Sequence, residues 1–328
     1  DEEESLLEIV SRYFEKTAVI LNVGNIIDMK WVEKYNIKSV MYVWQGGQDG
    51  GNAVADVLCG NVTPSGKLTD TIAKDISLYP STKNFGDPER NFYAEDIYVG
   101  YRYFETFARE DVLYPFGFGL SYTTFKTEVR DVSEADGKIS ISVNVENIGA
   151  YDGKEIVEIY FEAPQGKLGK SVRELCAFSK TGKLAPGEKC TLNISFDVDS
   201  MSAYDDSGVT GNKSCCVLEA GEYNIYAGGC VRCAEKVYTH TESKTRVTKK
   251  LTEAMSPVEE FNIMYPDPAD NGYKVGYKKA SLRTGDYDKR IKDELPKDIL
   301  YTGDRGIKLI DVKNGASSMN EFTAQLSD

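Results

Sequence analysis

The feature that most constrains the fold of this chain is a long region, about residues 126–249, in which apolar and polar residues alternate. Because successive side chains on a strand point to opposite faces, a period of two is typical of strands with one buried face. The run at 139–145 alternates along its whole length. Further segments with strand character lie at 155–161, 172–178, 190–198, 221–227 and 236–241. Several short strands separated by turns predict a β-sandwich.

The first 78 residues combine helical and strand patterns instead. Apolar residues recur at helical spacing near the start, after the acidic run at 2–4, which the helix dipole favours in a first turn. Short apolar runs at 17–23 and 39–44 are typical of buried parallel strands, and helices are expected over 28–35 and 52–58. This order predicts right-handed crossovers in a mostly parallel sheet, with further strands expected upstream of residue 1.

A dense series of aromatic residues, interrupted by turn residues, separates these two regions. It has little periodicity of its own but much area to bury, which predicts an extended connector in the seam between two domains. Arg102 lies among these rings, and we expect it to stack on one of them and to form an ion pair. Three carboxylates are close to it in sequence: Glu95, Asp96 and Glu105.

The expected fold class is therefore α/β plus all-β, in four parts. A partial α/β domain (1–78) with a mostly parallel sheet is followed by the aromatic-rich connector (79–120). A β-sandwich of fibronectin type III style (121–250) and an extended tail (251–328) complete the chain. The polar segment 201–213 predicts a surface loop, and the prolines within 264–268 are expected to break regular structure. Ser318 and Glu321 stand at capping-box spacing before a short helix.

Charge and composition exclude several functions. With 39 basic and 52 acidic residues the net charge is −13, which argues against a nucleic-acid partner or an anionic membrane surface. Apolar stretches stay well short of the ~20 residues of a membrane span. The only histidine, His240, lies in an alternating run, so a strand-surface residue is a better interpretation than a catalytic one. A multi-histidine metal centre is excluded.

The seven cysteines are an odd number, so they cannot all pair within the chain. Cys59, Cys176 and Cys190 lie in apolar or strand-like surroundings and are interpreted as small core residues. A second group could bind zinc or pair: Cys215, Cys216, Cys230 and Cys233. Adjacent cysteines on a strand point to opposite faces, which opposes a four-thiolate site, so we predict no metal and no cofactor. This pattern of cysteine usage slightly favours a cytoplasmic location of bacterial type.

Two segments carry a family resemblance. The first is WQGGQDGGNAVADVLCG at 44–60, continued by VTPSGKL at 62–68, and the second is IYVGYRYF at 97–104, followed by LYPFGFGLSYTTF at 113–125. Together they resemble the later half of the α/β sandwich domain of glycoside hydrolase family 3 and its junction with the fibronectin-III-like domain. The resemblance covers about residues 1–245. Residues 296–309 resemble the lead-in of permuted members, in which a barrel domain follows the sandwich.

The resemblance implies part of a retaining exo-β-glycosidase, of β-glucosidase type, that acts on oligosaccharides or β-glucosides. In the family the nucleophile is an Asp of the barrel and the acid/base is commonly a Glu on a loop of the α/β domain. No residue of this chain maps onto either position. Glu2, Glu3 and Glu4 occupy an acidic first turn that the helix dipole explains. We therefore expect no catalytic residue here and an inactive isolated chain, with the barrel domain as partner and a homodimer left open.

Trp44 and Gln45 are the candidate substrate-binding residues. They stand at the carboxyl end of a predicted parallel strand, where α/β sheets place ligand groups. Trp44 could stack on a sugar, and the alternative is an aromatic that fills a domain seam. The glycines at 46–51 lack the Lys-Ser/Thr of a P-loop and are better explained by a tight turn.

The alternative for the whole chain is a stand-alone carbohydrate-binding or structural β-sandwich protein. A carbohydrate-binding sandwich would need a solvent-exposed row of aromatic side chains on one sheet face. The predicted sandwich strands offer few: Tyr160, Phe161, Tyr223 and Tyr226.

Overall fold

The computed structural model describes residues 2–295 and 298–326 and divides into two compact units, Asp1–Leu282 and Arg283–Asp328. The larger unit contains the expected sandwich and the α/β part, and each unit is described by itself. Residues 296 and 297, at the start of the predicted lead-in segment, lie outside the described residues.

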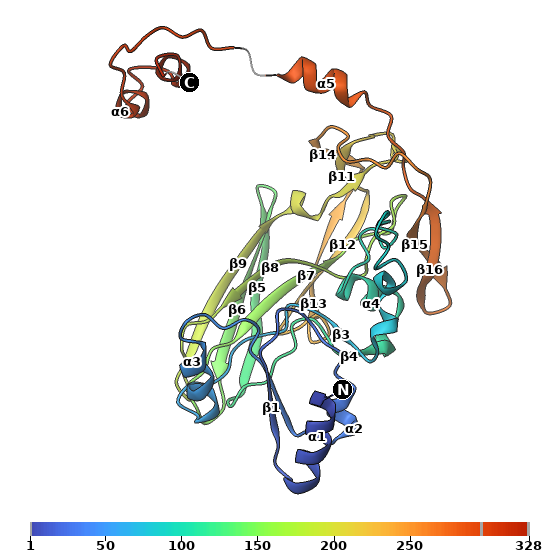
Figure 1. The fold of residues 1–328 in the computed structure, drawn as a ribbon, viewed down its shortest axis with the longest axis vertical. Coiled ribbons are helices and arrows are strands. Elements are labelled where there is room, and N and C mark those ends of the chain that lie inside the picture. The colour runs from blue at the N-terminus through green and yellow to red at the C-terminus, as the bar shows by residue number, and fades with distance from the viewer. Residues whose placement is uncertain (1, 296–297, 327–328) are drawn as a thin grey trace. The chain divides into compact units, whose positions relative to one another are not determined.

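Two antiparallel sheets form the sandwich and enclose the largest core (Figure 1). One sheet has the order β5-β6-β9, with β5 at Phe125–Ala135, β6 at Lys138–Asn147 and β9 at Lys189–Asp197. The other has the order β13-β12-β7-β8. Its strands are β7 Ile156–Glu162, β8 Glu174–Lys180, β12 Gly221–Gly228 and β13 Glu235–Glu242. All six predicted strands are found, which confirms the β-sandwich.

The alternation of the sequence explains why these strands bury one face. On β6 the side chains of Ile139, Ile141, Val143 and Val145 are at most 1% exposed, while the intervening residues face outward. Strand β5 is absent from the predicted strands. A register shift between Val129 and Asp131 interrupts its pairing with β6 and breaks the period of two.

A third, smaller sheet has the order β10-β11-β14. It consists of β10 Ala203–Asp205, β11 Cys215–Leu218 and β14 Arg246–Lys250, and the 3₁₀ helix η4 covers Val198–Met201. The prediction of a surface loop over 201–213 is wrong for Met201 and Asp205, which are 1% and 0% exposed. The Asp205 carboxylate accepts hydrogen bonds from the backbone N–H groups of Gly208, Val209 and Thr210. The polar segment therefore folds around a buried acid.

The α/β part contains the predicted parallel pair. Strands β1 (Ala18–Leu21) and β2 (Ser39–Tyr42) pair in parallel. The same part contains the helices α1 (Glu2–Tyr13), α2 (Trp31–Lys34) and α3 (Gly50–Leu58) (Figure 1). A second pair, β3 (Ile72–Ala73) with β4 (Val112–Tyr114), is antiparallel. The sheets of the described chain are thus mostly antiparallel, with one parallel pair.

The aromatic-rich connector is not extended throughout, contrary to the prediction. It contains the helix α4 (Tyr101–Phe107), and 3₁₀ helices lie in or beside it: η1 Ile76–Leu78, η2 Pro80–Lys83 and η3 Arg109–Asp111. Tyr98 and Phe104 are 2% and 0% exposed, whereas Phe85 and Tyr93 are 90% and 74% exposed. The aromatic series therefore supplies a small core around α4, and part of it stays at the surface.

The segment 264–268, which we expected to break regular structure, lies in a strand. Strand β15 (Asn262–Ala269) pairs antiparallel with β16 (Gly272–Lys279) along its whole length. The backbone N–H of Met264 donates to Ala94 O, on the side away from β16. Pro266 and Pro268 follow at a period of two, so their missing N–H groups fall on that same outer edge. The two prolines therefore remove no N–H donor from the backbone hydrogen bonds between β15 and β16.

In the unit Arg283–Asp328, the described residues form the helices α5 Tyr287–Glu294, α6 Leu309–Lys313 and α7 Met319–Thr323. The predicted capping box is confirmed, since Ser318 Oγ accepts from Glu321 N and the Glu321 carboxylate accepts from Ser318 N. Asp286 caps α5 in a similar way, by accepting from Lys289 N. Across the described residues, the helices are too short or too polar to cross a membrane.

Candidate functional site

The candidate residues Trp44 and Gln45 lie directly after β2, in the turn that leads to α3. The backbone of Trp44 has φ 59°, in the left-handed region that bulky residues seldom adopt. Such strained positions are often found at ligand sites. Trp44 is half-buried and Gln45 is exposed. An indole ring and an amide are thus presented together at the carboxyl end of the parallel pair.

The turns after β1 and β2 contact each other at this site. The Gln45 amide packs on Gly24, where an added Cβ would come within 2.8 Å of Gln45 Nε2. The Tyr42 hydroxyl donates to Asn25 O at 2.8 Å, and the Tyr42 ring lies 4.6 Å from that of Trp44 between centroids. Burial raises the pKa of Tyr42. The site offers stacking and neutral hydrogen bonds, which suit a sugar.

The glycine-rich turn between β2 and α3 fits the tight-turn interpretation. A Cβ on Gly46 would lie 3.1 Å from the Cα of Gly50, so the backbone approach at Gly46 favours glycine. The Gly50 N–H donates to Gly47 O at 3.0 Å and closes the turn.

In the acidic first turn of α1, Glu4 binds side chains of the neighbouring helix region. Glu4 accepts hydrogen bonds from Lys34 Nζ at 2.6 Å and from Tyr35 Oη at 3.2 Å. These two contacts lower the pKa of Glu4, so it stays ionised. Glu4 ties α1 to α2, which is a poor setting for a group that must donate a proton.

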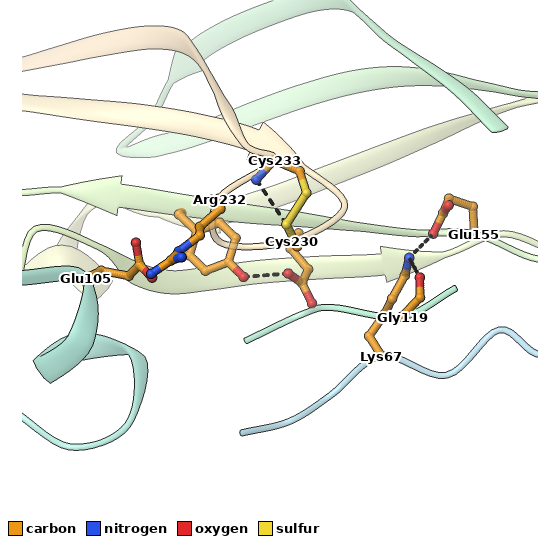
Figure 2. The surroundings of a disulfide bond; sticks show 9 residues. Lys67, Glu105, Gly119, Glu155, Cys230, Arg232 and Cys233 are labelled. Atoms are coloured by element: carbon orange, nitrogen blue, oxygen red, sulfur yellow. Dashed lines mark hydrogen bonds and ion pairs between the residues drawn. A yellow bond between two sulfur atoms is a disulfide. The ribbon is translucent and has the colours of Figure 1, made fainter. Parts of the chain in front are cut away.

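The ion-pair prediction for Arg102 is wrong. Within the described part of the chain, the buried Glu105 carboxylate pairs instead with Arg232 at 2.8 Å and with Arg109 at 3.4 Å. Figure 2 shows Arg232 reaching from the sandwich side toward Glu105. Arg102 lies 6.0 Å from the centre of the Tyr101 ring, so the expected stacking is present at long range. Arg232 is distant in sequence, and no local pattern pointed to it.

His240 is also placed differently from the prediction, because it is only 8% exposed. Its Nδ1 lies 3.0 Å from Glu134 Oε1. His240 is on β13 and Glu134 on β5, so the contact joins the two sheets of the sandwich. A structural role accounts for this histidine.

The cysteines do not form a zinc site in the described residues, where no group of three or more metal-ligating side chains is present. Cys230 and Cys233 are joined in a disulfide, which settles the pairing that the sequence left open. The other five, Cys59, Cys176, Cys190, Cys215 and Cys216, are free thiols. Cys59 is exposed, so its assignment to a core is wrong.

The aromatic side chains that a carbohydrate-binding sandwich would need are not available. Tyr160 and Tyr223 are 0% exposed and Phe161 is 5% exposed. The Arg173 guanidinium covers the Tyr226 ring at 3.4 Å from its centre. A shallow groove of about 600 Å³ lies between β8 and β9, lined by Phe178, Asn193 and neighbouring residues, and it does not include Trp44 or Gln45.

Comparison with known proteins agrees with these features. Residues 1–122 match the glycosyl hydrolase family 3 C-terminal domain, and residues 155–230 match the fibronectin type III-like domain. The two matched regions correspond to the α/β part and the β-sandwich described above. The chain belongs to glycoside hydrolase family 3.

Its relatives include a β-glucosidase of Ruminococcus albus, 47% identical over 100% of this chain and 34% of the relative. β-Glucosidase A of Butyrivibrio fibrisolvens is 43% identical over 81% of the chain and 34% of its own length. A solved β-glucosidase of Paenibacillus barengoltzii superimposes with a TM-score of 0.92 at 47% identity, over 100% of this chain and 37% of that one. The chain spans about a third of the length of these two curated relatives.

Proposed function

We propose that this chain is the non-catalytic part of a retaining exo-β-glycosidase of β-glucosidase type, which removes terminal β-linked sugars from oligosaccharides. One observation carries the proposal: the whole chain is 47% identical to a β-glucosidase of which it covers only 34%. The alternative of a stand-alone sugar-binding sandwich is weakened by the burial of Tyr160, Phe161 and Tyr223.

Both catalytic carboxylates are assigned to parts of the protein outside this chain. A retaining glycosidase needs two carboxyl groups roughly 5–5.5 Å apart, one as nucleophile and one as acid/base. Two acids have partners within the chain: Glu4 of the first turn is bound to Lys34, and the buried Glu105 is bound to Arg232. Neither is free to attack an anomeric carbon or to protonate a leaving group.

An exposed apolar face on α1 supports a larger assembly. Leu6, Ile9 and Tyr13 are 61%, 54% and 79% exposed, although their spacing is that of a core-facing stripe. Clustered apolar side chains at the surface usually mark a contact with another surface. We assign this face to further α/β structure of the same enzyme.

The four parts 1–78, 79–120, 121–250 and 251–328 remain our proposed domain limits, with the last leading toward a barrel domain. The tail at 251–328 has a counterpart in the R. albus relative, whose match runs over all 328 residues. A homodimer is a separate proposal, which light scattering on the complete protein tests directly.

Trp44 and Gln45 are proposed to face the substrate, with the indole stacking on a sugar ring and the amide bonding a hydroxyl. The positive φ of Trp44 and the exposure of Gln45 support this role. In the complete enzyme, Trp44→Ala should raise KM at least tenfold with a smaller change in kcat, because uniform binding is lost. Phe178→Ala, in the remote groove, is the matched control and should leave KM unchanged. An unchanged KM for both variants would contradict the assignment.

Activity tests the main proposal. The complete protein should hydrolyse an aryl β-glucoside, and the 328-residue chain alone should not. Turnover by the chain alone, abolished by changing one of its own carboxylates, would overturn it. Saturable binding of cello-oligosaccharides to the chain, lost in Phe178→Ala, would favour the sugar-binding sandwich instead.

A further inference from the structure

The loop between β12 and β13 is closed by the Cys230–Cys233 disulfide. Cys230 is only 4% exposed, whereas Cys233 is exposed to solvent. The backbone N–H of Cys233 donates to Cys230 Sγ at 3.0 Å. One sulfur of the pair is therefore on a solvent-exposed residue, and the other is held in the protein beside a hydrogen-bond donor.

The same loop holds the sandwich against the α4 region (Figure 2). Arg232, between the two cysteines, donates from Nε to Glu105 Oε1 at 2.8 Å and from Nη2 to Arg109 O at 2.7 Å. The N–H of Val231, which is 3% exposed, donates to Phe116 O at 3.2 Å. We call these three contacts the Arg232 clamp.

The clamp carries a buried charge. The Glu105 side chain is 2% exposed, so its carboxylate depends on Arg232 and Arg109 for compensation. Arg109 is itself 59% exposed, which leaves Arg232 as the better-shielded partner. Whatever fixes the position of Arg232 therefore also fixes the seam between α4 and the sandwich.

The disulfide is poorly suited to be a staple of the global fold. It joins residues only three apart, and a cross-link over so short a loop removes little freedom from the unfolded chain. Its effect is instead local, on the four residues that include Arg232. A covalent bond with a local effect and one exposed cysteine is suited to reversible chemistry.

We propose that Cys230 and Cys233 form a redox-active pair, a substrate for small or protein dithiols, whose oxidation locks the Arg232 clamp. The thiolate of the dithiol attacks Sγ of the exposed Cys233, a mixed disulfide forms, and the Cys230–Cys233 bond breaks. Cys230 leaves as a thiolate that accepts the Cys233 N–H and then takes up a proton. The second thiol of the reagent attacks the mixed disulfide, so the dithiol is oxidised by two electrons and both cysteines become thiols.

Reduction opens the covalent ring that the disulfide closes over residues 230–233. The backbone of Arg232, which is part of this ring, can then adopt a wider range of conformations. Holding Arg232 on Glu105 then costs the loop more conformational entropy, so the ion pair is weaker. Local opening of α4 becomes more frequent as a result. Oxidation reverses the change. The pair thus couples the thiol–disulfide balance of the surroundings to the rigidity of the seam.

The first test uses thiol trapping on the complete protein. It is equilibrated in buffers of reduced and oxidised dithiothreitol, quenched with acid and alkylated, and peptides are read by mass spectrometry. Cys230 and Cys233 should convert together and reversibly, while Cys176, the matched control, stays a thiol throughout. Two permanently alkylated thiols at 230 and 233, or a disulfide that no dithiol reduces, would overturn the proposal.

The second test uses hydrogen exchange with the same protein. Peptides covering 101–109 and 114–118 should exchange about tenfold faster after reduction, while the core strand at 139–145 is unchanged. The double variant Cys230→Ser, Cys233→Ser should resemble the reduced protein under all conditions. Arg232→Gln should exchange fast even when oxidised and should respond little to reduction. Equal exchange in the oxidised and reduced protein would show that the disulfide does not control the clamp.

Discussion

The sandwich and the α/β part of this chain differ in how completely they bury their own apolar residues. Between the two sheets of the sandwich, 17 buried side chains form one continuous cluster. Around the parallel pair β1–β2 the buried cluster of the described residues is small, with Leu21, Met29 and Ile72, and the apolar stripe of α1 is exposed. The sandwich supplies both faces of its core. The α/β part leaves the α1 stripe uncovered, as expected from the further α/β structure that we propose.

The two parts of the chain therefore differ in what they indicate about function. A complete core explains a fold and says little about partners, whereas an uncovered apolar face is a candidate contact surface. The features that point beyond the chain, the α1 face and the turn at Trp44, both belong to the less complete part.

The largest effect is expected from breaking a buried ion pair on the sandwich side. Lys170 and Glu219 have side chains 3% and 5% exposed, and Lys170 Nζ also donates to Pro164 O at 3.0 Å. Lys170→Met leaves the Glu219 charge buried without its cation and should cost about 3–5 kcal/mol of unfolding free energy. Urea denaturation measures this loss of unfolding free energy. The control Lys183→Met removes an exposed pair with Asp152 and should change little, and equal losses would contradict the comparison.

A core truncation in the sandwich should come next. Ile159 on β7 is 0% exposed and lies in the main cluster. Ile159→Ala should lower the free energy of unfolding by about 2–5 kcal/mol, because transfer energy is lost and a cavity remains. Thermal and urea denaturation should agree on this loss. A change as small as that of an exposed isoleucine would mean that the sandwich core is not what stabilises this part.

A smaller, pH-dependent effect is expected where the two parts meet. Glu158 is buried and accepts from the Tyr160 hydroxyl, and a Cβ on Gly117 would collide with its carboxylate. Burial raises the pKa of Glu158 above its ordinary value near 4.5. Its contribution to stability is therefore present below the unfolded pKa and is lost as pH rises through the folded pKa.

Glu158→Gln keeps an acceptor for Tyr160 and removes that titration. The stability of the variant relative to the unchanged protein should increase between pH 4 and pH 7. Unfolding curves at several pH values measure the difference, with Glu146→Gln, at a partly exposed pair with Lys189, as control. A difference that does not vary with pH would contradict the raised pKa.

The smallest effect is expected on α1 in the chain alone. Ile9 is 54% exposed, so Ile9→Ala should change the free energy of unfolding by less than about 0.5 kcal/mol. In the complete protein the same substitution should cost clearly more, because the face is then covered. Equal small effects in both would mean that the α1 face is not an internal contact of the enzyme.

Local patterns were sufficient for the parallel pair and for the strands of the two sandwich sheets other than β5. The strict alternation at 139–145 and the capping box at Ser318 each depend on neighbours in sequence, and both were predicted correctly. Failures occurred where a distant residue decides the outcome. Strand β15 exists because β16 pairs with its non-proline edge, and the segment around Asp205 is buried because backbone N–H groups converge on one carboxylate.

The candidate site shows the same limit. The place of Trp44 after a parallel strand followed from the order of elements, but its positive φ and the packing of Gln45 on Gly24 required coordinates. The partner of Glu105 could not be found either, because Arg232 lies 127 positions further along the chain. Sequence separation of that size leaves no periodic signal.

The prolines of β15 have a consequence for how this protein behaves in concentrated solution. A two-stranded hairpin normally offers its rim as a template onto which another molecule can add a strand. Here Pro266 and Pro268 delete two successive donors from that rim, and Met264 has already committed its own to Ala94. Between Met264 and Pro268 an incoming strand would find acceptors without free donors, so this edge of β15 is a poor template for strand addition.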